Sequence, residues 1–212
     1  MIFDMDGVLV DTEPRHFAAL DRVLAAEGHR LPHEFNHELL GLTLESTWDL
    51  VVARLGLTGP REDYYRRYDL AVLAELARPL DPLPGVTAWL DAVEAVGLPR
   101  ALASSSPRAW VEATLAALGL ADRFAVTVAG DEVTAGKPAP EIFLRTARKL
   151  GVPPSACLVI EDSPAGIEAG RRAGMRVLAV RTPLTAGLTL PADWVVDSLE
   201  DIDLAEWFPR LG

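Results

Sequence analysis

"ACLVIEDSPAGIEAGRRAGMRVLAV", residues 156–180, is the stretch that decides the fold. It opens and closes on a short apolar run of strand length, and a helical pattern separates the two runs. Ser163 is typical of a residue that caps a helix start, and Gly174 of one that ends a helix. Because two parallel strands joined by a helix form a right-handed crossover, this stretch predicts one unit of an α/β sheet.

The same alternation extends upstream to about residue 84 and downstream to residue 196. Helical patterns and apolar runs of strand length take turns over residues 85–97, 100–104, 107–119, 124–130, 137–151 and 193–196. We interpret Ser106 as the cap of the helix that follows it and Pro107 as that helix's first residue. The sequence therefore predicts an α/β fold, a doubly wound and Rossmann-like parallel sheet. Only "MIF" precedes Asp4, which is short for a first strand, so residues upstream of Met1 are an open possibility.

Residues 14–79 break this rhythm. Three amphipathic helical patterns follow one another there without a strand signal, over residues 14–28, 44–56 and 61–77. We expect a mobile helical cap domain over residues 14–79, inserted into a core domain of residues 1–13 and 80–212. Pro14 and the Pro-rich segment 78–85 are the expected hinges.

Composition excludes several classes of function. The chain has 212 residues, half of them hydrophobic, so it can bury a full core. A net charge of −11 and a pI near 4.8 argue against nucleic acid or an anionic membrane as a partner. The single cysteine, Cys157, fits a reducing compartment. The given residues contain no basic segment followed by an apolar segment of the signal-peptide type, and no apolar run of about 20 residues. We expect a soluble, cytoplasmic, monomeric protein.

Polar side chains follow four of the apolar runs, where the strands of the predicted sheet end. In chain order they are Asp4 and Asp6, then Ser104, Ser105 and Ser106, then Lys137, then Glu161 and Asp162. Ligands of open α/β sheets bind at this edge. Carboxylates there can hold a hard cation, and hydroxyl or ammonium groups can hold an oxyanion. The pattern indicates a Mg²⁺ site built for phosphoryl transfer to or from a small phosphomonoester.

Asp4 and Asp6 have complementary roles in such a reaction. A carboxylate can attack phosphorus and form an aspartyl phosphate if a cation screens the repulsion between the two anions. A second carboxyl group two residues on can protonate the leaving oxygen and later take a proton from water. Gly7 supplies the turn that lets both carboxyl groups reach one point.

Lysine usage supports a special role for Lys137. Of the 20 basic residues, only Lys137 and Lys149 are lysine and the rest are arginine. A position that needed only positive charge would hold arginine in this chain, whereas a compact ammonium fits between a carboxylate and a phosphate. Lys149 lies near a predicted helix C-terminus, where a cation is favoured without any further function.

Four motifs of the chain resemble, in order, those of the haloacid-dehalogenase (HAD) superfamily. They are "DMDGVLVD" (4–11), the serine that ends "RALAS" (100–104), "GKPAPE" (136–141) and "VIEDSPAGIEAG" (159–170). The resemblance covers nearly the whole chain and is greatest to the β-phosphoglucomutase-like phosphatases, which carry a helical cap at the same place. It implies a HAD-type core with these roles: Asp4 as nucleophile, Asp6 as general acid and base, Ser104, Ser105 and Lys137 as phosphate-binding residues, and Asp4, the backbone carbonyl of Asp6, Glu161 and Asp162 on the Mg²⁺ side.

Two other reactions of this family compete with hydrolysis. The family's dehalogenases lack the second aspartate that Asp6 provides. His16 lies where the mutases carry a cap histidine, and we expect it to bind substrate. The mutase cap also needs a basic loop for a second phosphate, whereas the matching positions here are Leu40 and Leu44. Leu44, together with Leu42 and Trp48, predicts contact with a carbon skeleton. We therefore predict a phosphatase for a sugar or polyol monophosphate; a sugar phosphomutase and a non-catalytic phosphoryl-binding protein stay open as alternatives.

One competing motif points to zinc. "HEFNH" (33–37) fits the H-E-x-x-H pattern of metalloproteases. It follows Pro32 and lies in the predicted cap, with no evident third ligand. We interpret it as a solvated helix start.

Overall fold

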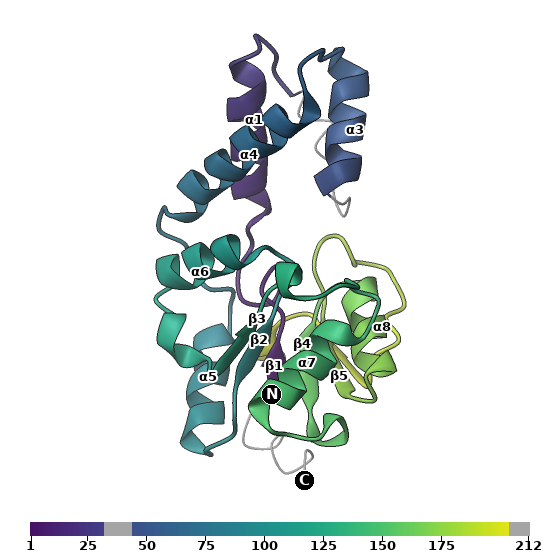
Figure 1. Cartoon of the computed structure of the whole chain (residues 1–212). Coiled ribbons are helices and arrows are strands. Elements are labelled where there is room, and N and C mark those ends of the chain that lie inside the picture. Colours follow the sequence, from purple (N-terminus) through teal and green to yellow (C-terminus); the bar gives the residue numbers. More distant parts are fainter. Residues whose placement is uncertain (32–43, 204–212) are drawn as a thin grey trace. The chain divides into compact units, whose positions relative to one another are not determined.

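The computed structural model describes residues 1–31 and 44–203 of the chain (Figure 1). Its contacts divide the chain into two compact units. Met1–Asp11 and Pro79–Gly212 form the first, which we call the core unit, and Thr12–Arg78 form the second, the helical unit. The "HEFNH" motif, Leu40 and Leu42 lie outside the described residues.

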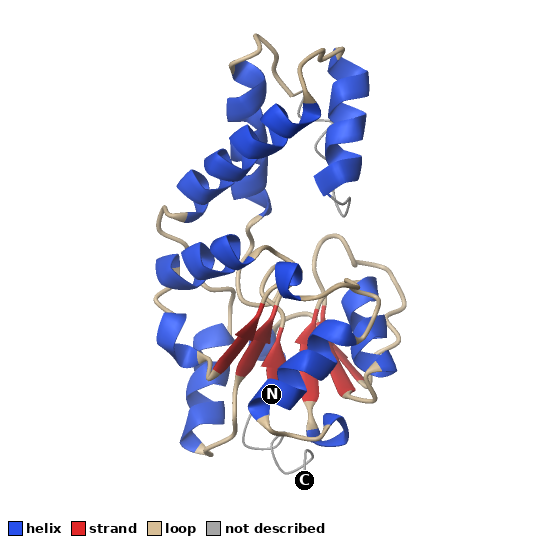
Figure 2. Ribbon diagram, viewed as in Figure 1, coloured by secondary structure: helices blue, strands red, loops and turns tan. Residues whose placement is uncertain are grey.

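The core unit is built on a six-stranded parallel sheet with the order β3-β2-β1-β4-β5-β6 (Figure 2). The strands are β1 (Ile2–Phe3), β2 (Ala101–Ala103), β3 (Val126–Val128), β4 (Leu158–Glu161), β5 (Arg176–Val180) and β6 (Trp194–Val196). β1 pairs with β2 on one side and with β4 on the other, so the direction of winding reverses there. The predicted α/β fold is confirmed, and the reversal marks the edge where ligands of such sheets bind.

Two apolar clusters cover the two faces of this sheet, because alternate strand residues point in opposite directions. Phe3, Leu102, Ile160 and Leu178 pack with α5 (Val86–Ala95) and α6 (Arg108–Ala117). Ile2, Ala101, Val159 and Val177 pack with α7 (Glu141–Leu150) and α8 (Pro164–Arg172). Because both faces of the sheet are buried, the sequences of its strands are continuous apolar runs.

Short 3₁₀ helices complete the core unit. They are η2 (Ala121–Arg123), η3 (Gly130–Glu132), η4 (Pro154–Ala156) and η5 (Leu199–Asp201). η3 leads from β3 towards Lys137 and α7. It therefore lies between the end of β3 and the predicted site residue Lys137.

The predicted cap of α8 is confirmed, whereas that of α6 is wrong. Ser163 Oγ accepts a hydrogen bond from the Gly166 N–H at 3.0 Å. α6 begins at Arg108 instead of Pro107, because Pro107 is extended with ψ of 152°. The Asp131 carboxylate accepts the N–H of Arg108 at 3.1 Å, and the Ser106 hydroxyl bonds to Asp6 instead of capping the helix.

The described part of the helical unit contains α1 (Glu13–Ala25), α3 (Leu44–Leu55) and α4 (Arg61–Leu76). Glu75 is buried on α4, and its carboxylate accepts from Arg22 and Arg78 at 2.8 Å each. Trp48 is wholly buried and stacks on Tyr64, with ring centroids 5.4 Å apart. The expectation that Trp48 contacts a substrate was therefore wrong, since the apolar face of α3 uses this ring to build the unit's own core.

Among the described residues, no helix is long and apolar enough to cross a membrane.

Candidate active site

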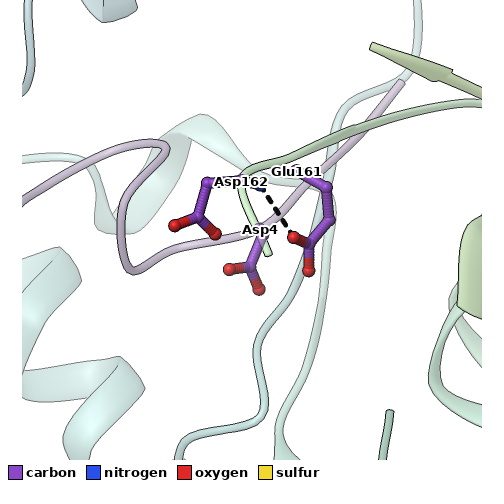
Figure 3. A group of neighbouring side chains, drawn as sticks. All are labelled: Asp4, Glu161 and Asp162. Atoms are coloured by element: carbon purple, nitrogen blue, oxygen red, sulfur yellow. Dashed lines mark hydrogen bonds between the residues drawn. The ribbon is translucent and has the colours of Figure 1, made fainter. Parts of the chain in front are cut away.

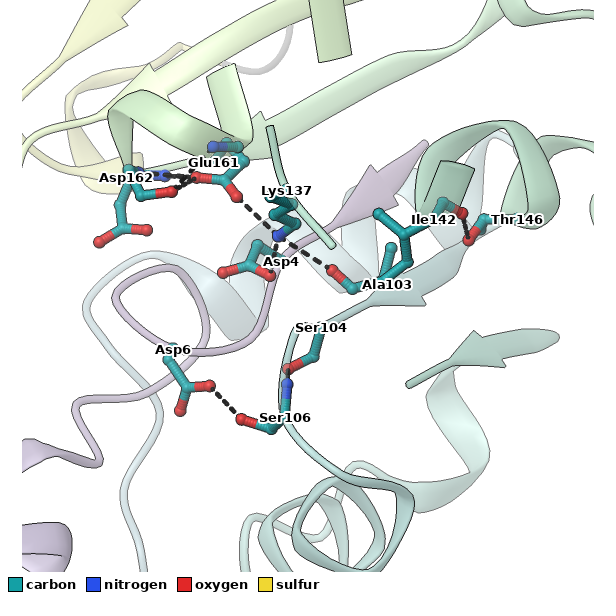
Figure 4. A network of polar contacts seen from close by, with 12 residues as sticks. Asp4, Asp6, Ala103, Ser104, Ser106, Lys137, Ile142, Thr146, Glu161 and Asp162 are labelled. Carbon is teal, nitrogen blue, oxygen red and sulfur yellow. Dashed lines mark hydrogen bonds and ion pairs between the residues drawn. The ribbon is translucent and has the colours of Figure 1, made fainter. Parts of the chain in front are cut away.

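Asp4 stands at the carboxyl end of the central strand and is held by Lys137. Its side chain is largely buried, and Lys137 Nζ donates to Asp4 Oδ1 at 2.6 Å (Figure 4). The same ammonium donates to Glu161 Oε1 at 2.7 Å and lies 3.4 Å from the Ala103 carbonyl oxygen. Lys137 thus joins the ends of β1, β2 and β4 at one point, and its contact with a phosphate stays a prediction.

Glu161 is fixed by the start of α8. Glu161 is fully buried, and its Oε2 accepts the N–H groups of Asp162 and Ser163 at 2.7 Å each and the Ser163 hydroxyl at 3.0 Å. A Cβ added to Gly166 would lie 1.6 Å from Glu161 Oε1, so only glycine leaves room for this carboxylate over the first turn of α8. Both oxygens of Glu161 therefore accept hydrogen bonds from fixed groups of the core unit.

Asp4, Glu161 and Asp162 form an acidic cluster. One oxygen from each of the three carboxylates lies within 4.8 Å of the others (Figure 3). Gly7, in the left-handed region with φ of 78°, makes this possible, since a Cβ there would lie 2.1 Å from Asp162 Oδ2. These are hard oxygen donors on rigid strand ends, the ligand type that Mg²⁺ prefers.

The cluster carries more negative charge than Lys137 can balance. Burial raises the pKa of Asp162 to about 9, and the negative charges of Glu161 and Asp4 contribute further. Burial also raises the pKa of Asp4 to about 7, although the Lys137 ammonium opposes this. Burial acts to lower the pKa of Lys137, but Asp4 and Glu161 outweigh it and raise that pKa well above its usual range. A divalent cation would relieve this repulsion, so the residues present fit one.

Asp6 and the serine loop after β2 lie at the same edge of the sheet. Ser106 Oγ donates to Asp6 Oδ2 at 3.0 Å, and Ser104 Oγ accepts the N–H of Ser106 at 3.1 Å (Figure 4). Ser104 is fully buried and Ser105 is exposed. The sequence placed Ser106 at this edge but did not predict its bond to Asp6, because its position before Pro107 also fits a helix cap.

His16 lies in the helical unit, on α1. Its Nδ1 is 3.1 Å from the Tyr68 hydroxyl of α4. The substrate role of His16 stays a prediction.

The structure places most of the other predicted site residues in two networks. One contains Asp4, Lys137, Glu161 and Asp162, and the second contains Asp6 with Ser104 and Ser106.

Comparisons with known proteins agree with this geometry. A family model for haloacid dehalogenase-like hydrolases matches residues 1–174. The fructose-1-phosphate phosphatase YqaB of Escherichia coli is 38% identical over 85% of this chain and 95% of its own length. A phosphorylated carbohydrates phosphatase of Thermotoga maritima is 34% identical over 90% of this chain and 88% of its own. The crystal structure of a β-phosphoglucomutase from Clostridium difficile superposes with a TM-score of 0.78 at 27% identity, covering 99% of this chain and 95% of that one.

Proposed function

This chain belongs to the family of haloacid dehalogenase-like hydrolases and is a phosphatase, and on this premise we propose that it hydrolyses a sugar or polyol monophosphate through an aspartyl phosphate, with Mg²⁺ as cofactor. The observation that carries the proposal is the buried Asp4 carboxylate at the end of β1, held by Lys137 beside Glu161 and Asp162. The named substrates of the two phosphatase relatives support the substrate class.

In the first step, an Asp4 oxygen attacks the phosphorus of the ester. The bond from phosphorus to the ester oxygen breaks, and Asp6 gives that oxygen a proton, so the alcohol leaves neutral. Ser104, Ser105 and Lys137 are the proposed phosphate-binding residues. Lys137 is already oriented by Asp4 and Glu161, so its ammonium needs little reorganisation.

In the second step, water attacks the phosphorus of the aspartyl phosphate. Asp6, now ionised, takes the proton from that water, and the bond between phosphorus and the Asp4 oxygen breaks. Inorganic phosphate leaves and Asp4 is a free carboxylate again.

Mg²⁺ would be held by Asp4, Asp162 and the backbone carbonyl of Asp6, with Glu161 supporting them. When bound, it neutralises charge on the phosphate and on the attacking carboxylate.

The two lysines offer a matched pair of variants. Lys137→Met removes the ammonium that bridges Asp4 and Glu161, so kcat/KM for p-nitrophenyl phosphate should fall by about 10²–10³-fold, as for other lost oxyanion donors. Lys149→Met breaks a half-exposed ion pair with Glu132 and should stay within about twofold of the wild type. Equal effects of the two changes would remove Lys137 from the phosphate site.

The competing mutase reaction has a direct test. β-Glucose 1-phosphate is incubated with Mg²⁺ and a trace of the 1,6-bisphosphate, and glucose 6-phosphate and free phosphate are both followed. We expect free phosphate to be the main product, because the predicted cap loop carries leucines where a mutase needs basic groups for its second phosphate. Rapid formation of glucose 6-phosphate with little free phosphate would establish a mutase, and no turnover of any phosphomonoester in a substrate screen would establish a binding protein.

A further inference from the structure

The hydrogen bond between Ser106 and Asp6 links the proposed proton donor to the loop after β2. Ser106 Oγ donates to Asp6 Oδ2 at 3.0 Å. The bond fixes one carboxyl oxygen and so sets the direction of the other, which in the proposed mechanism faces the leaving oxygen. The position of Ser106 therefore affects proton transfer from Asp6, and so do the groups that hold Ser106 in place.

The loop after β2, which carries Ser105 and Ser106 and which we call the Ser106 loop, packs against η3. The Gly130 N–H donates to the Ser106 carbonyl oxygen at 2.9 Å. A Cβ at Gly130 would lie 2.0 Å from the Ser105 carbonyl oxygen, so the two backbones approach as closely as glycine permits. A small shift of η3 would therefore move Ser106.

Arg108 ties this loop to β3 and η3. Its Nη1 donates to Thr127 Oγ1 at 2.6 Å, and its Nη2 donates to the Thr127 carbonyl oxygen at 3.0 Å and pairs with Glu132. Its backbone N–H is bound by Asp131. We call Arg108, Thr127, Asp131 and Glu132 the Arg108 clamp.

Glu132 is the anchor of the Arg108 clamp. Its Oε1 also accepts the Ala129 N–H at 3.0 Å, and its Oε2 accepts Lys149 Nζ at 2.9 Å. Burial acts against ionisation, but the bonds from Lys149, Ala129 and Arg108 lower the pKa of Glu132 to about 2. Glu132 is therefore anionic at any working pH, and Arg108 always has its partner.

We infer that Ser106 and Arg108 are positioning residues for proton transfer at Asp6, Ser106 by its bond to the carboxyl group and Arg108 by holding the Ser106 loop on η3. The inference rests on the proposed function, in which Asp6 protonates the leaving oxygen. A clamp that only stabilised the fold would change the melting temperature and leave the discrimination between leaving groups alone.

The test compares kcat/KM for phenyl phosphate and p-nitrophenyl phosphate. The two esters have nearly the same shape, but nitrophenolate leaves readily without a proton and phenolate does not. Ser106→Ala and Arg108→Met should each lower kcat/KM for phenyl phosphate about fivefold more than for p-nitrophenyl phosphate, as part of the acid contribution is lost. The double variant should match Ser106→Ala within about twofold, because both changes act through one hydroxyl group.

Arg123→Met is the matched control. Arg123 is an arginine of similar exposure in the core unit, at 23% against 31% for Arg108, and it pairs with Asp91 and Glu94. It should leave the ratio of the two kcat/KM values unchanged. Thr127→Val removes only the hydroxyl group that accepts a hydrogen bond from Arg108. It is the milder variant if Arg108→Met does not fold, and it should shift the ratio of the two kcat/KM values in the same direction as Arg108→Met.

A wild-type ratio in Arg108→Met and Thr127→Val, in enzyme that is folded by its melting curve, overturns the inference and leaves the proposed function standing. Wild type that turns over neither of these esters nor any phosphomonoester of a substrate screen would instead defeat the proposed function.

Discussion

Replacing Asp4 by asparagine should lower kcat by at least about 10⁴-fold, the scale of effect seen when an enzyme loses its nucleophile. The amide keeps the shape of the side chain but has no charged oxygen to attack phosphorus. Lys137 and Glu161 stay in place, so inorganic phosphate should still bind. The measurement is kcat with p-nitrophenyl phosphate, together with the inhibition constant of inorganic phosphate.

Asp122→Asn on η2 is the control for this change, because Asp122 is an exposed aspartate of the core unit outside both networks of the site. It should behave as wild type. Activity of Asp4→Asn within about tenfold of the wild type would show that Asp4 is not the nucleophile.

Removal of the metal should abolish activity. Asp4 and Asp162 are held together by the fold with too little positive charge nearby, so an anionic phosphate would be repelled unless a cation is bound. We expect a chelator to stop turnover, Mg²⁺ to restore it, and Ca²⁺ to inhibit, because the larger and looser shell of Ca²⁺ misplaces the nucleophile. Activity is measured after chelation and after each metal is added back.

The pH dependence of the Mg²⁺ requirement follows from the raised pKa values of Asp4, about 7, and Asp162, about 9. Both groups hold protons below these values, and Mg²⁺ must displace them. Half-maximal activity should therefore need less Mg²⁺ at pH 8 than at pH 6. Full activity in chelator, or restoration by Zn²⁺ alone, would contradict the assignment.

The sequence predicted the core sheet well because its strands are buried on both faces. Continuous apolar runs with glycine at the helix ends leave little ambiguity, and the carboxyl ends of parallel strands must meet at one edge. Asp4, Lys137, Glu161 and Asp162 come together for that reason.

The side-chain hydrogen bonds of the site could not be predicted from the sequence. Ser106 before Pro107 fits a helix cap equally well, and only the structure shows that α6 begins at Arg108 and that the Ser106 hydroxyl donates to Asp6. Trp48 was expected to contact a substrate because its packing partners on other helices, such as Tyr64, are distant along the chain. Arg108 contacts Thr127 and Glu132, which are also distant from it along the chain, and no local sequence motif indicates these contacts.

A covalent phosphoryl group on Asp4 is the central intermediate of the proposed function, and reductive trapping detects it most directly. Enzyme turning over p-nitrophenyl phosphate with Mg²⁺ is quenched with borohydride, which reduces an aspartyl phosphate to homoserine, and the peptides are sequenced by mass spectrometry. We expect homoserine at position 4 in the presence of substrate and none in its absence. Homoserine at position 6 or 162, or an unmodified Asp4 in enzyme quenched during rapid turnover, would contradict it.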